Sequence, residues 1–395
     1  MMKLTKACIP LGGAWSSPFV RWQGSLAEVS SLDLAVSVTE RALRDREIPL
    51  TDVSQLVLGW TIPQPNVFYG APTVAARLGA TSITGPMISQ ACATAAVAIA
   101  HAATATEAGD DGLHLVVLTD RTSNGPLLAY PAPSSPGGAP LVENWVLDSF
   151  RCDPWAGKAM IDTAEAVAAE EGISREEIDD VTALRYQQYE RSLADERSFQ
   201  RRYMVPIAIP AKRGDSTVID RDAGIHPTNR GTLAQLKPVA AGGVMTYGSQ
   251  THPADGTAGV LITTEERARA LGAEGVARIL GFGTARVQKA RMPKAPVPAA
   301  RAALAAANLD FGAVDAVTTH NPFAVNDIYF ARQSGIPIEA MNAYGSSLVY
   351  GHPQAPTGAR AIAELIETLR LRGGGIGLFT GCAAGDSGAA IVMRV

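Results

Sequence analysis

The sequence predicts a layered α/β protein that consists of two similar halves and an inserted subdomain. Three observations support this: the length of 395 residues without low-complexity tracts, a repeated helix-turn-strand pattern, and a long insertion in the first copy only. A chain of this length buries a large core. With 47% hydrophobic and 18% charged residues, we expect disorder only in short loops.

The repeat is visible directly in the sequence. RALRDREIPLTDVSQLVL, residues 41–58, aligns without a gap to AALAAANLDFGAVDAVTT, residues 302–319. Each segment has the pattern of a helix end, a turn and a β-branched strand. Both copies continue with a helix, an extended run, a longer helix and a strand, and they close on similar strands at 259–264 and 389–395. The repeat therefore predicts two halves related by pseudo-two-fold symmetry.

The same pattern predicts the domain boundaries. We expect an N-terminal half from residues 1–122 together with 252–277, and a C-terminal half from residues 278–395. Residues 123–251 have no counterpart in the second half and are rich in Pro, Gly and charged residues. We interpret them as an inserted loop subdomain with helices of its own.

The composition excludes several classes of protein. A formal charge of -4 without a long basic stripe argues against nucleic acid or an anionic membrane as the main partner. The N-terminal apolar run is too short for a secretory signal, and no segment has about 20 consecutive strongly apolar residues. We therefore expect a cytoplasmic protein. The four cysteines lie far apart without zinc-finger spacing, so we expect free thiols and no metal site.

One of these cysteines stands at a notable position. In SQACATAAVAIA, Cys92 marks the point where an extended run gives way to a helix with small apolar residues on nearly every face. A helix N-terminus is expected to lower the pKa of a thiol and favour nucleophilic attack. The repeat places His352 at the equivalent junction, so symmetry would bring a base to the thiol at a shared cleft. The alternative is that Cys92 is a small buried hydrophobe.

Six motifs carry a family resemblance, namely SQACATAAVAIA, LKPVAAGGVMTYGSQTHPADGTAG, NPFAVND, YGHPQAPTGARAIAELIETLRLRG, GLFTGCAAGDSGAAIV and MIDTAEAVAAEEGISREEID. Through these motifs the sequence resembles the thiolases, which are acyl-CoA C-acyltransferases, along nearly its whole length. The resemblance implies a layered αβαβα fold with a loop subdomain that binds CoA and substrate. It also implies a ping-pong reaction, either thiolytic cleavage of a 3-ketoacyl-CoA or the reverse Claisen condensation of acyl-CoAs. Coenzyme A would be a substrate, no metal or redox cofactor would be needed, and the protein would form a homodimer or homotetramer.

The resemblance also implies catalytic roles. Cys92 would be the acylated nucleophile, His352 its base, and Cys382 the acid/base for the α-carbon or for CoA. Asn321 would hold a water that forms one oxyanion hole with His352, and the amides of Cys92 and Ala384 would form the other. Taken singly, His352 could be a turn residue, Asn321 a helix cap and Cys382 a packed loop thiol.

The substrate side departs from the family pattern. Thr251-His252 stands where the family commonly has Ser-Gly against pantetheine, and Ala159 stands where many relatives have a histidine. The family's Asn-Glu-Ala-Phe signature appears as NPFA, with Pro322 second, or as a one-residue shift. The acyl group is therefore not necessarily acetyl. Candidates for binding substrate or CoA are Thr251, His252, Met160, Phe323 and Arg230, and the candidates for CoA phosphates are Lys212, Arg213, Arg221, Lys237 and, preferred among them, Arg230.

Three other functions fit part of the sequence. A ketosynthase-like decarboxylating enzyme shares the fold, but there a second histidine usually replaces the second cysteine, whereas Cys382 is retained here. A non-catalytic acyl-CoA-binding protein would be expected to lose at least one of the four catalytic residues. GDSGA at 385–389 is similar to the nucleophile loop of trypsin-like proteases, but that fold is all-β.

Overall fold

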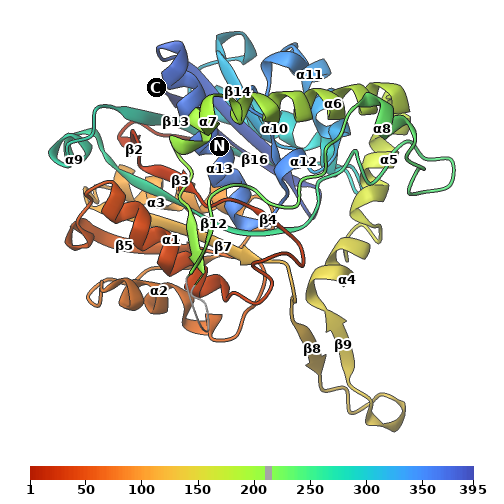
Figure 1. Cartoon of the computed structure of the whole chain (residues 1–395), viewed down its shortest axis with the longest axis horizontal. Coiled ribbons are helices and arrows are strands. Elements are labelled where there is room, and N and C mark those ends of the chain that lie inside the picture. Colours follow the sequence, from red (N-terminus) through yellow and green to blue (C-terminus); the bar gives the residue numbers. More distant parts are fainter. Residues whose placement is uncertain (210–215) are drawn as a thin grey trace.

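A computed structural model describes residues 1–209 and 216–395 as one α/β body with a projecting hairpin (Figure 1). Lys212 and Arg213, two of the candidates for CoA phosphates, lie outside the described residues. Within the described ranges, no helix is long and apolar enough to cross a membrane.

Most described strands belong to one mixed 12-stranded sheet. The short strands β1 (Met2–Lys3), β3 (Ala14–Ser16) and β4 (Val20–Arg21) pair at its side with β13 or β12. The main order is β14 (Ala316–His320), β15 (Ile376–Ala383), β16 (Ser387–Arg394), β13 (Val276–Arg286), β2 (Ala7–Pro10), β12 (Ala254–Thr264), β7 (Leu113–Arg121), β5 (Val53–Gly59) and β6 (Met87–Ile88).

The predicted repeat appears as the same strand pattern built twice. In the first half β5 runs parallel to β7, and β7 runs antiparallel to β12. In the second half β14 runs parallel to β15, and β15 runs antiparallel to β16. Strand β2 pairs with both β12 and β13, so it joins the two half-sheets. β7, β14 and β15 are buried almost throughout, as expected for apolar strands covered on both faces.

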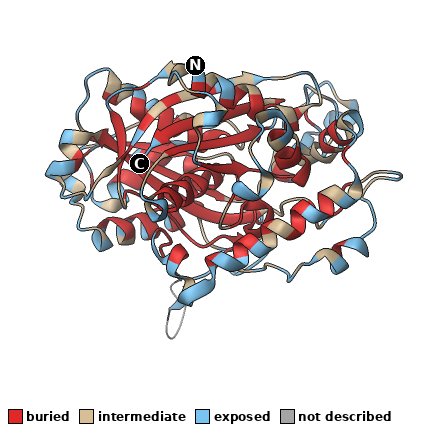
Figure 2. Cartoon of the chain, turned by 90° about the horizontal axis from the view of Figure 1, so that it is seen from above, coloured by how far each residue is buried: buried red, intermediate tan, exposed pale blue. Residues whose placement is uncertain are grey.

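Two helices lie between the half-sheets. Strands of both halves contact α3 (Thr94–Glu107) and α13 (Ala355–Arg372), and the two helices pack on each other. A Cβ on Gly358 would lie 2.9 Å from the Cβ of Ala95, so glycine permits this close approach. The interior of the body is correspondingly buried (Figure 2).

Four more helices cover the outer faces. α1 (Ser31–Asp45) and α2 (Gly70–Leu78) pack on the strands of the first half. In the second half α10 (Pro296–Ala306) packs on the strands, with α11 (Ala324–Ser334) against it. This confirms the predicted layered α/β fold. Shorter elements are α9 (Glu265–Ala270), α12 (Ser347–Tyr350) and 3-10 helices at Leu50–Asp52, Val67–Tyr69, Pro136–Gly138, Met292–Lys294, Phe311–Ala313 and Ile338–Ala340.

The insertion leaves the first half and packs against both halves, with α5 and α6 against the second half and β10 against α1 of the first. Its helices share an apolar cluster with Phe323, Ile328 and Cys382, and a buried ion pair of 2.8 Å joins Arg185 to Asp327 of α11. The hairpin of β8 and β9 projects from the body (Figure 1). The elements are β8 (Leu127–Tyr130), β9 (Leu141–Asn144), α4 (Trp145–Arg151), α5 (Met160–Glu171), α6 (Arg175–Ser192), α7 (Ala194–Arg201), β10 (Ile207–Ile209), β11 (Thr217–Ile219) and α8 (Arg230–Ala234).

Candidate active site

Cys92 lies in a tight turn between β6 and α3. The preceding Ala91 has a φ of 45°, which a residue other than glycine rarely adopts. The Thr94 hydroxyl stabilises this turn, because it accepts from the Gln90 amide at 2.8 Å and donates to the Ala91 carbonyl at 2.7 Å. Such local strain is commonly found at functional positions.

His352 occupies the equivalent junction before α13. Its backbone amide donates to the His252 carbonyl at 2.9 Å, and its Nδ1 lies 2.6 Å from Thr357 Oγ1. Gln354, just before the helix, has a φ of 66° and a ψ of -102°. Both junctions therefore contain a residue other than glycine with a positive φ.

The two junctions meet in space. Nε2 of His352 lies 3.2 Å from Sγ of Cys92, although the residues are 260 positions apart in the chain. Burial raises the pKa of Cys92 to about 11, and it lowers the pKa of His352 well below its usual value. The expectation that the helix N-terminus lowers the pKa of Cys92 is therefore wrong, because burial outweighs the helix. The resting pair consists of a neutral thiol and a neutral imidazole.

A buried carboxyl group lies next to this pair. Asp120, at the end of β7, accepts hydrogen bonds from the amides of Thr61 and Ile62 and from the first amide of α13, each at 2.9 Å. Burial raises its pKa to about 7 despite these bonds. The negative charge of Asp120 also contributes to the raised pKa of Cys92.

The structure brings a second histidine to the pair, which sequence reasoning missed. His320 ends β14, and one of its ring nitrogens lies within 4.8 Å of both Cys92 Sγ and a ring nitrogen of His352. The two imidazole centroids are 4.0 Å apart. Gly381 on the neighbouring strand leaves room, because a Cβ there would lie 2.8 Å from the Cβ of His320. Burial lowers the pKa of His320 to about 3.

Asn321, which was predicted for an oxyanion hole, is engaged elsewhere. Its amide donates to Asp327 Oδ2 at 2.7 Å, and its Oδ1 lies 3.5 Å from the Ser347 hydroxyl oxygen. Asn321 follows the last residue of β14, and its side chain shares the Ser347 hydroxyl with His320. Because Asn321 is bonded to Asp327 whereas His320 lies beside the thiol, His320 is a second candidate for the place for which Asn321 was named. The signal was present in the sequence, because HNPF fits the family signature with a one-residue shift.

Cys382 and Ala384 also lie near the thiol. The backbone amides of Ala384 and of Cys92 itself act to lower the pKa of the Cys92 thiol, against the larger effect of burial. Cys382 is fully buried in β15, and its sulfur accepts a 3.2 Å hydrogen bond from the Asn326 side chain. Burial raises the pKa of Cys382 well above its usual value, and the nearby Cys92 adds to this effect.

Thr251 and His252 form hydrogen bonds to the loops on either side of the site. Thr251 donates from its amide to the Pro322 carbonyl at 2.7 Å, and its hydroxyl donates to the Ser347 carbonyl at 2.5 Å. His252 accepts the amide of His352, as described above. These bonds connect the loop after β14 to the loop before α13.

The remaining substrate candidates lie in the insertion or beside it. Met160 begins α5 and packs, half-buried, against the apolar cluster that contains Phe323 and Cys382. Arg230 at the start of α8 forms ion pairs with Glu176, Asp179 and Asp180 of α6.

Comparison with known proteins identifies the family. The thiolase N-terminal domain matches residues 12–266, and the thiolase C-terminal domain matches residues 273–395. The chain belongs to the thiolase family. Our predicted boundary at residues 277/278 stays a prediction, and β13, which begins at Val276, spans it.

Its relatives among curated thiolases match along almost their full length. Acetyl-CoA acetyltransferase from Chromobacterium violaceum is 29% identical, over 94% of this chain and 95% of that protein. The 3-oxoadipyl-CoA/3-oxo-5,6-dehydrosuberyl-CoA thiolase from Escherichia coli is also 29% identical, over 96% of this chain and 97% of that protein. The chain is therefore a thiolase-type acyltransferase.

Solved thiolase structures share the fold. The Bacillus anthracis acetyl-CoA acetyltransferase superposes with a TM-score of 0.91 at 26% identity, and all of both chains is covered. Human mitochondrial 3-ketoacyl-CoA thiolase in complex with CoA also gives a TM-score of 0.91, at 24% identity, and covers 100% of this chain and 99% of that one.

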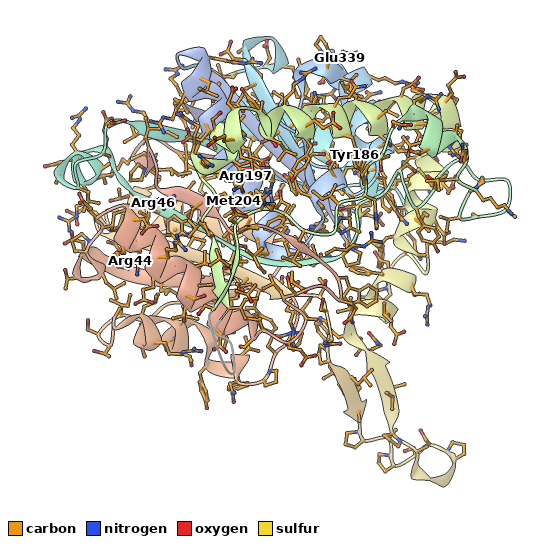
Figure 3. All side chains as sticks on the ribbon, in the orientation of Figure 1. Arg44, Arg46, Tyr186, Arg197, Met204 and Glu339 are labelled. Carbon is orange, nitrogen blue, oxygen red and sulfur yellow. The ribbon has the colours of Figure 1, made fainter. Side chains whose placement is uncertain are left out.

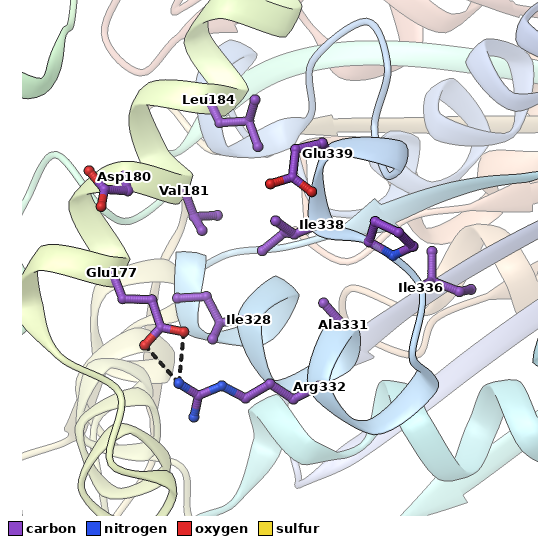
Figure 4. A pocket seen from close by; sticks show the side chains of 11 residues that line it. Glu177, Asp180, Val181, Leu184, Ile328, Ala331, Arg332, Ile336, Ile338 and Glu339 are labelled. Atoms are coloured by element: carbon purple, nitrogen blue, oxygen red, sulfur yellow. Dashed lines mark hydrogen bonds and ion pairs between the residues drawn. The ribbon is translucent and has the colours of Figure 1, made fainter.

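Two surface grooves accompany the thiolase core. One of about 500 Å³ lies between α6 and α11, is lined mainly by aliphatic side chains, and includes the pair of Arg332 with Glu177 (Figure 4). The other, of about 650 Å³, is lined by α6, α7 and residues 220–228. Tyr186 and Arg197 of this second groove are labelled in Figure 3. Its cationic side chains are Arg197, Arg201 and Arg221.

Proposed function

We propose that this thiolase transfers acyl groups to and from CoA through an acyl-enzyme on Cys92. It would cleave a 3-ketoacyl-CoA or, in reverse, condense two acyl-CoAs. The observation that carries the proposal is the 3.2 Å distance between Cys92 Sγ and His352 Nε2. A nucleophile within hydrogen-bond reach of a base that a third group orients is typical of covalent acyl transfer.

The first step joins proton transfer to attack. The Thr357 hydroxyl accepts from Nδ1 of His352 and leaves the Nε2 lone pair facing the thiol. Because both groups are neutral at rest, Nε2 takes the proton as the sulfur attacks the substrate carbonyl. In cleavage the carbonyl is the 3-keto group, and the C–C bond to the α-carbon then breaks. In condensation it is a thioester, and CoA leaves as its thiolate, which takes a proton from Cys382, while His352 keeps the proton of Cys92.

His320 would stabilise the oxyanion that forms during attack. The Ser347 hydroxyl lies 3.1 Å from Nδ1 of His320 and 3.5 Å from Oδ1 of Asn321, and its one proton would go to the nearer atom of His320, so that Nε2 carries the ring proton. This Nε2 is buried and has no hydrogen-bond partner among the described residues, which leaves it available for an anionic oxygen. The amides of Cys92 and Ala384 would serve the second acyl intermediate.

Cys382 would handle the second proton. In cleavage it gives its proton to the carbanion left at the α-carbon, and the resulting thiolate accepts the Asn326 amide hydrogen bond. The thiolate then takes the proton of CoA, whose sulfur attacks the acyl-enzyme and releases Cys92. In condensation the Cys382 thiolate, which is left after Cys382 protonates the departing CoA, removes the α-proton from the second acyl-CoA, and the released Cys92 takes its proton back from His352.

For the CoA phosphates the structure favours Arg221 over Arg230. Arg230 pairs with three carboxylates, those of Glu176, Asp179 and Asp180, and Asp179 is 1% exposed, so turning Arg230 towards a phosphate would break three ion pairs. Arg221 pairs with the exposed Asp220, and exposed pairs contribute little. We expect Arg221→Gln to raise the KM for CoA more than Arg230→Gln does. Equal or reversed effects would restore Arg230 as the phosphate contact.

The direct test is intact mass spectrometry after brief incubation with a panel of acyl-CoA and 3-ketoacyl-CoA thioesters. Wild type and Cys152→Ala, which removes an exposed thiol, should gain one acyl group that free CoA releases. Cys92→Ala should gain none. If folded wild type forms no adduct with any thioester, the non-catalytic acyl-CoA-binding function is favoured instead.

One observation favours testing a second function with the same panel of thioesters. The site contains two histidines beside the nucleophile, His320 and His352, which is a feature expected of ketosynthase-like decarboxylating enzymes. Such an enzyme would extend the acyl-enzyme with malonyl-CoA and release carbon dioxide. Product from malonyl-CoA without cleavage of acetoacetyl-CoA would favour this alternative, whereas retention of Cys382 favours the thiolase.

Assembly and location are part of the proposal. We expect a homodimer or homotetramer, supported by the apolar side chains exposed on the β8–β9 hairpin. Leu127, Leu141 and Val142 are 69%, 64% and 58% exposed. Light scattering should report two or four copies, and Leu141→Asp tests the hairpin. All four cysteines are unpaired, which supports a reducing, cytoplasmic setting.

A further inference from the structure

Three metal-ligating side chains converge at the start of α3. The sulfur of Cys92 and one ring nitrogen each of His320 and His352 all lie within 4.8 Å of one another. The donor atoms of a tetrahedral zinc ion are roughly 3.3–3.6 Å apart, because Zn–N is about 2.0–2.1 Å and Zn–S about 2.3 Å. Cys92 Sγ and His352 Nε2 are already 3.2 Å apart. Small side-chain rotations would bring all three donors to this spacing.

A hydroxyl group lies next to Nδ1 of each imidazole. Thr357 Oγ1 lies 2.6 Å from Nδ1 of His352, and Ser347 Oγ lies 3.1 Å from Nδ1 of His320. Metal-binding histidines typically donate their second ring N–H to such a partner, which fixes the orientation of the ring. Because a hydroxyl can accept as well as donate, Ser347 also supports the tautomer of His320 that carries its lone pair on Nε2.

His320 supplies the independent sign of a ligand. The residue is 1% exposed, and its Nε2 has no hydrogen-bond partner within the described ranges. A buried polar atom without a partner is costly, so the protein retains it where something else binds. The carboxyl group of Asp120, close enough to act on the Cys92 thiol, adds negative charge that suits a cation.

We propose that Cys92, His320 and His352 bind one Zn²⁺ ion, and that the ion reversibly blocks the nucleophile. One Zn–S bond and two Zn–N bonds form, the thiol proton leaves to solvent, and a water molecule completes the tetrahedron. The sulfur lone pair is then held by the metal, so attack on a thioester stops until a chelator removes the ion. Binding itself requires no catalysis, and only the inhibition rests on the proposed function.

The test uses Co²⁺ as an absorbing probe and Zn²⁺ as its competitor, on the full chain after reduction and chelation. Wild type should bind one Co²⁺ with a thiolate-to-cobalt charge-transfer band, and Zn²⁺ should abolish the band. Cys92→Ala should lose the band, and His320→Asn should bind at least about 10-fold more weakly. Matched controls are Cys152→Ala and His101→Gln, which remove an exposed thiol and an exposed imidazole and should bind as wild type does.

The outcomes separate this inference from the proposed function. An unchanged cobalt spectrum in Cys92→Ala, or loss of binding in Cys152→Ala, would overturn the site, with circular dichroism showing that each variant is folded. Zn²⁺ that binds wild type but leaves acylation by acetyl-CoA unaffected would overturn the block. If metal-free enzyme forms no acyl adduct while cobalt still binds through Cys92, the proposed function fails and the metal site stands.

Discussion

The junction before α3 and the junction before α13 occupy equivalent places in the two halves of the molecule. Each junction leads from a loop into a buried central helix. Each also contains a residue other than glycine with a positive φ, Ala91 in the first and Gln354 in the second. They differ in the side chain they present, which is the thiol of Cys92 in one and the imidazole of His352 in the other. The two halves thus share the same backbone arrangement, whereas the catalytic side chains are divided between them.

A second difference lies at the ends of equivalent strands. β5 ends at Gly59 and is followed by Trp60, whereas β14 ends at His320 and is followed by Asn321. The carboxyl ends of parallel strands are where α/β proteins place their ligand sites. The first half therefore contributes the nucleophile and Asp120, and the second half contributes both histidines and Cys382. Acyl transfer on this frame needs the two halves to act as one unit.

The largest expected effect comes from removing the Cys92 thiol or the His352 imidazole. Cys92→Ala and His352→Ala should each lower kcat for 3-ketoacyl-CoA cleavage by about 10³-fold to 10⁴-fold or more, because attack needs both the sulfur and its base. The double variant should cost little more than Cys92→Ala alone, as steady-state assays will measure. If the losses in kcat of the two single variants multiplied in the double variant, the two junctions would act independently.

The next largest effect concerns the strand end. His320→Ala should lower kcat by about 10²-fold to 10³-fold with little change in KM, as expected for loss of one oxyanion donor. His320→Asn should recover part of the loss, because a carboxamide also donates a hydrogen bond. If Asn321→Ala lowered kcat as strongly while His320→Ala did not, the original assignment to Asn321 would be correct.

The sequence predicted the frame better than the site. The gapless repeat and the all-round apolar helix after Cys92 were enough to predict two α/β halves and the meeting of Cys92 with His352. The sequence could not decide which of two adjacent residues at the end of β14 serves the oxyanion, since His320 and Asn321 are both plausible hydrogen-bond donors. The hydrogen bond from Asn321 to Asp327 and the space left by Gly381 beside His320 distinguish the two residues only in three dimensions.

The electrostatics of the pair were also beyond sequence reasoning. A helix N-terminus is visible in the sequence and favours thiolate, but the extent of burial is not visible. In the structure burial dominates and raises the pKa of Cys92. Similarly, Arg230 was preferred for its position in the chain, whereas its partners on α6 depend on how the insertion folds.

A smaller effect should separate the two cysteines. Asn326→Leu removes the amide that stabilises the Cys382 thiolate, and a hydrogen bond to a charged group contributes about 1.5–3 kcal/mol. We expect overall turnover to fall by about 10-fold or more, while the rate of acylation of Cys92 by S-(4-nitrophenyl) thioacetate, whose leaving group needs no proton from Cys382, stays within about twofold. Quenched-flow mass spectrometry measures the two rates. Equal losses in both steps would mean that Asn326 supports the whole site structurally.

Thr357→Val tests how His352 is oriented. The change keeps the shape but removes the oxygen 2.6 Å from Nδ1, and a neutral hydrogen bond contributes about 0.5–1.5 kcal/mol. We expect kcat to fall roughly 2-fold to 12-fold with KM for the thioester unchanged. Thr368→Val, on the same helix but away from the site, is the control. An equal loss in both variants would indicate a general effect on α13.

The smallest expected effect is on the pH dependence of acylation. With the pKa of Cys92 raised to about 11 and that of His352 lowered, neither group changes its protonation between about pH 8 and about pH 9.5. Asp120, with a pKa of about 7, is already ionised throughout this range. The rate of acylation by acetyl-CoA should therefore change by less than about twofold, because His352 removes the proton in the same step as attack. A rate that rises about tenfold per pH unit would instead identify free thiolate as the nucleophile, and the two junctions would then not form an acid-base pair.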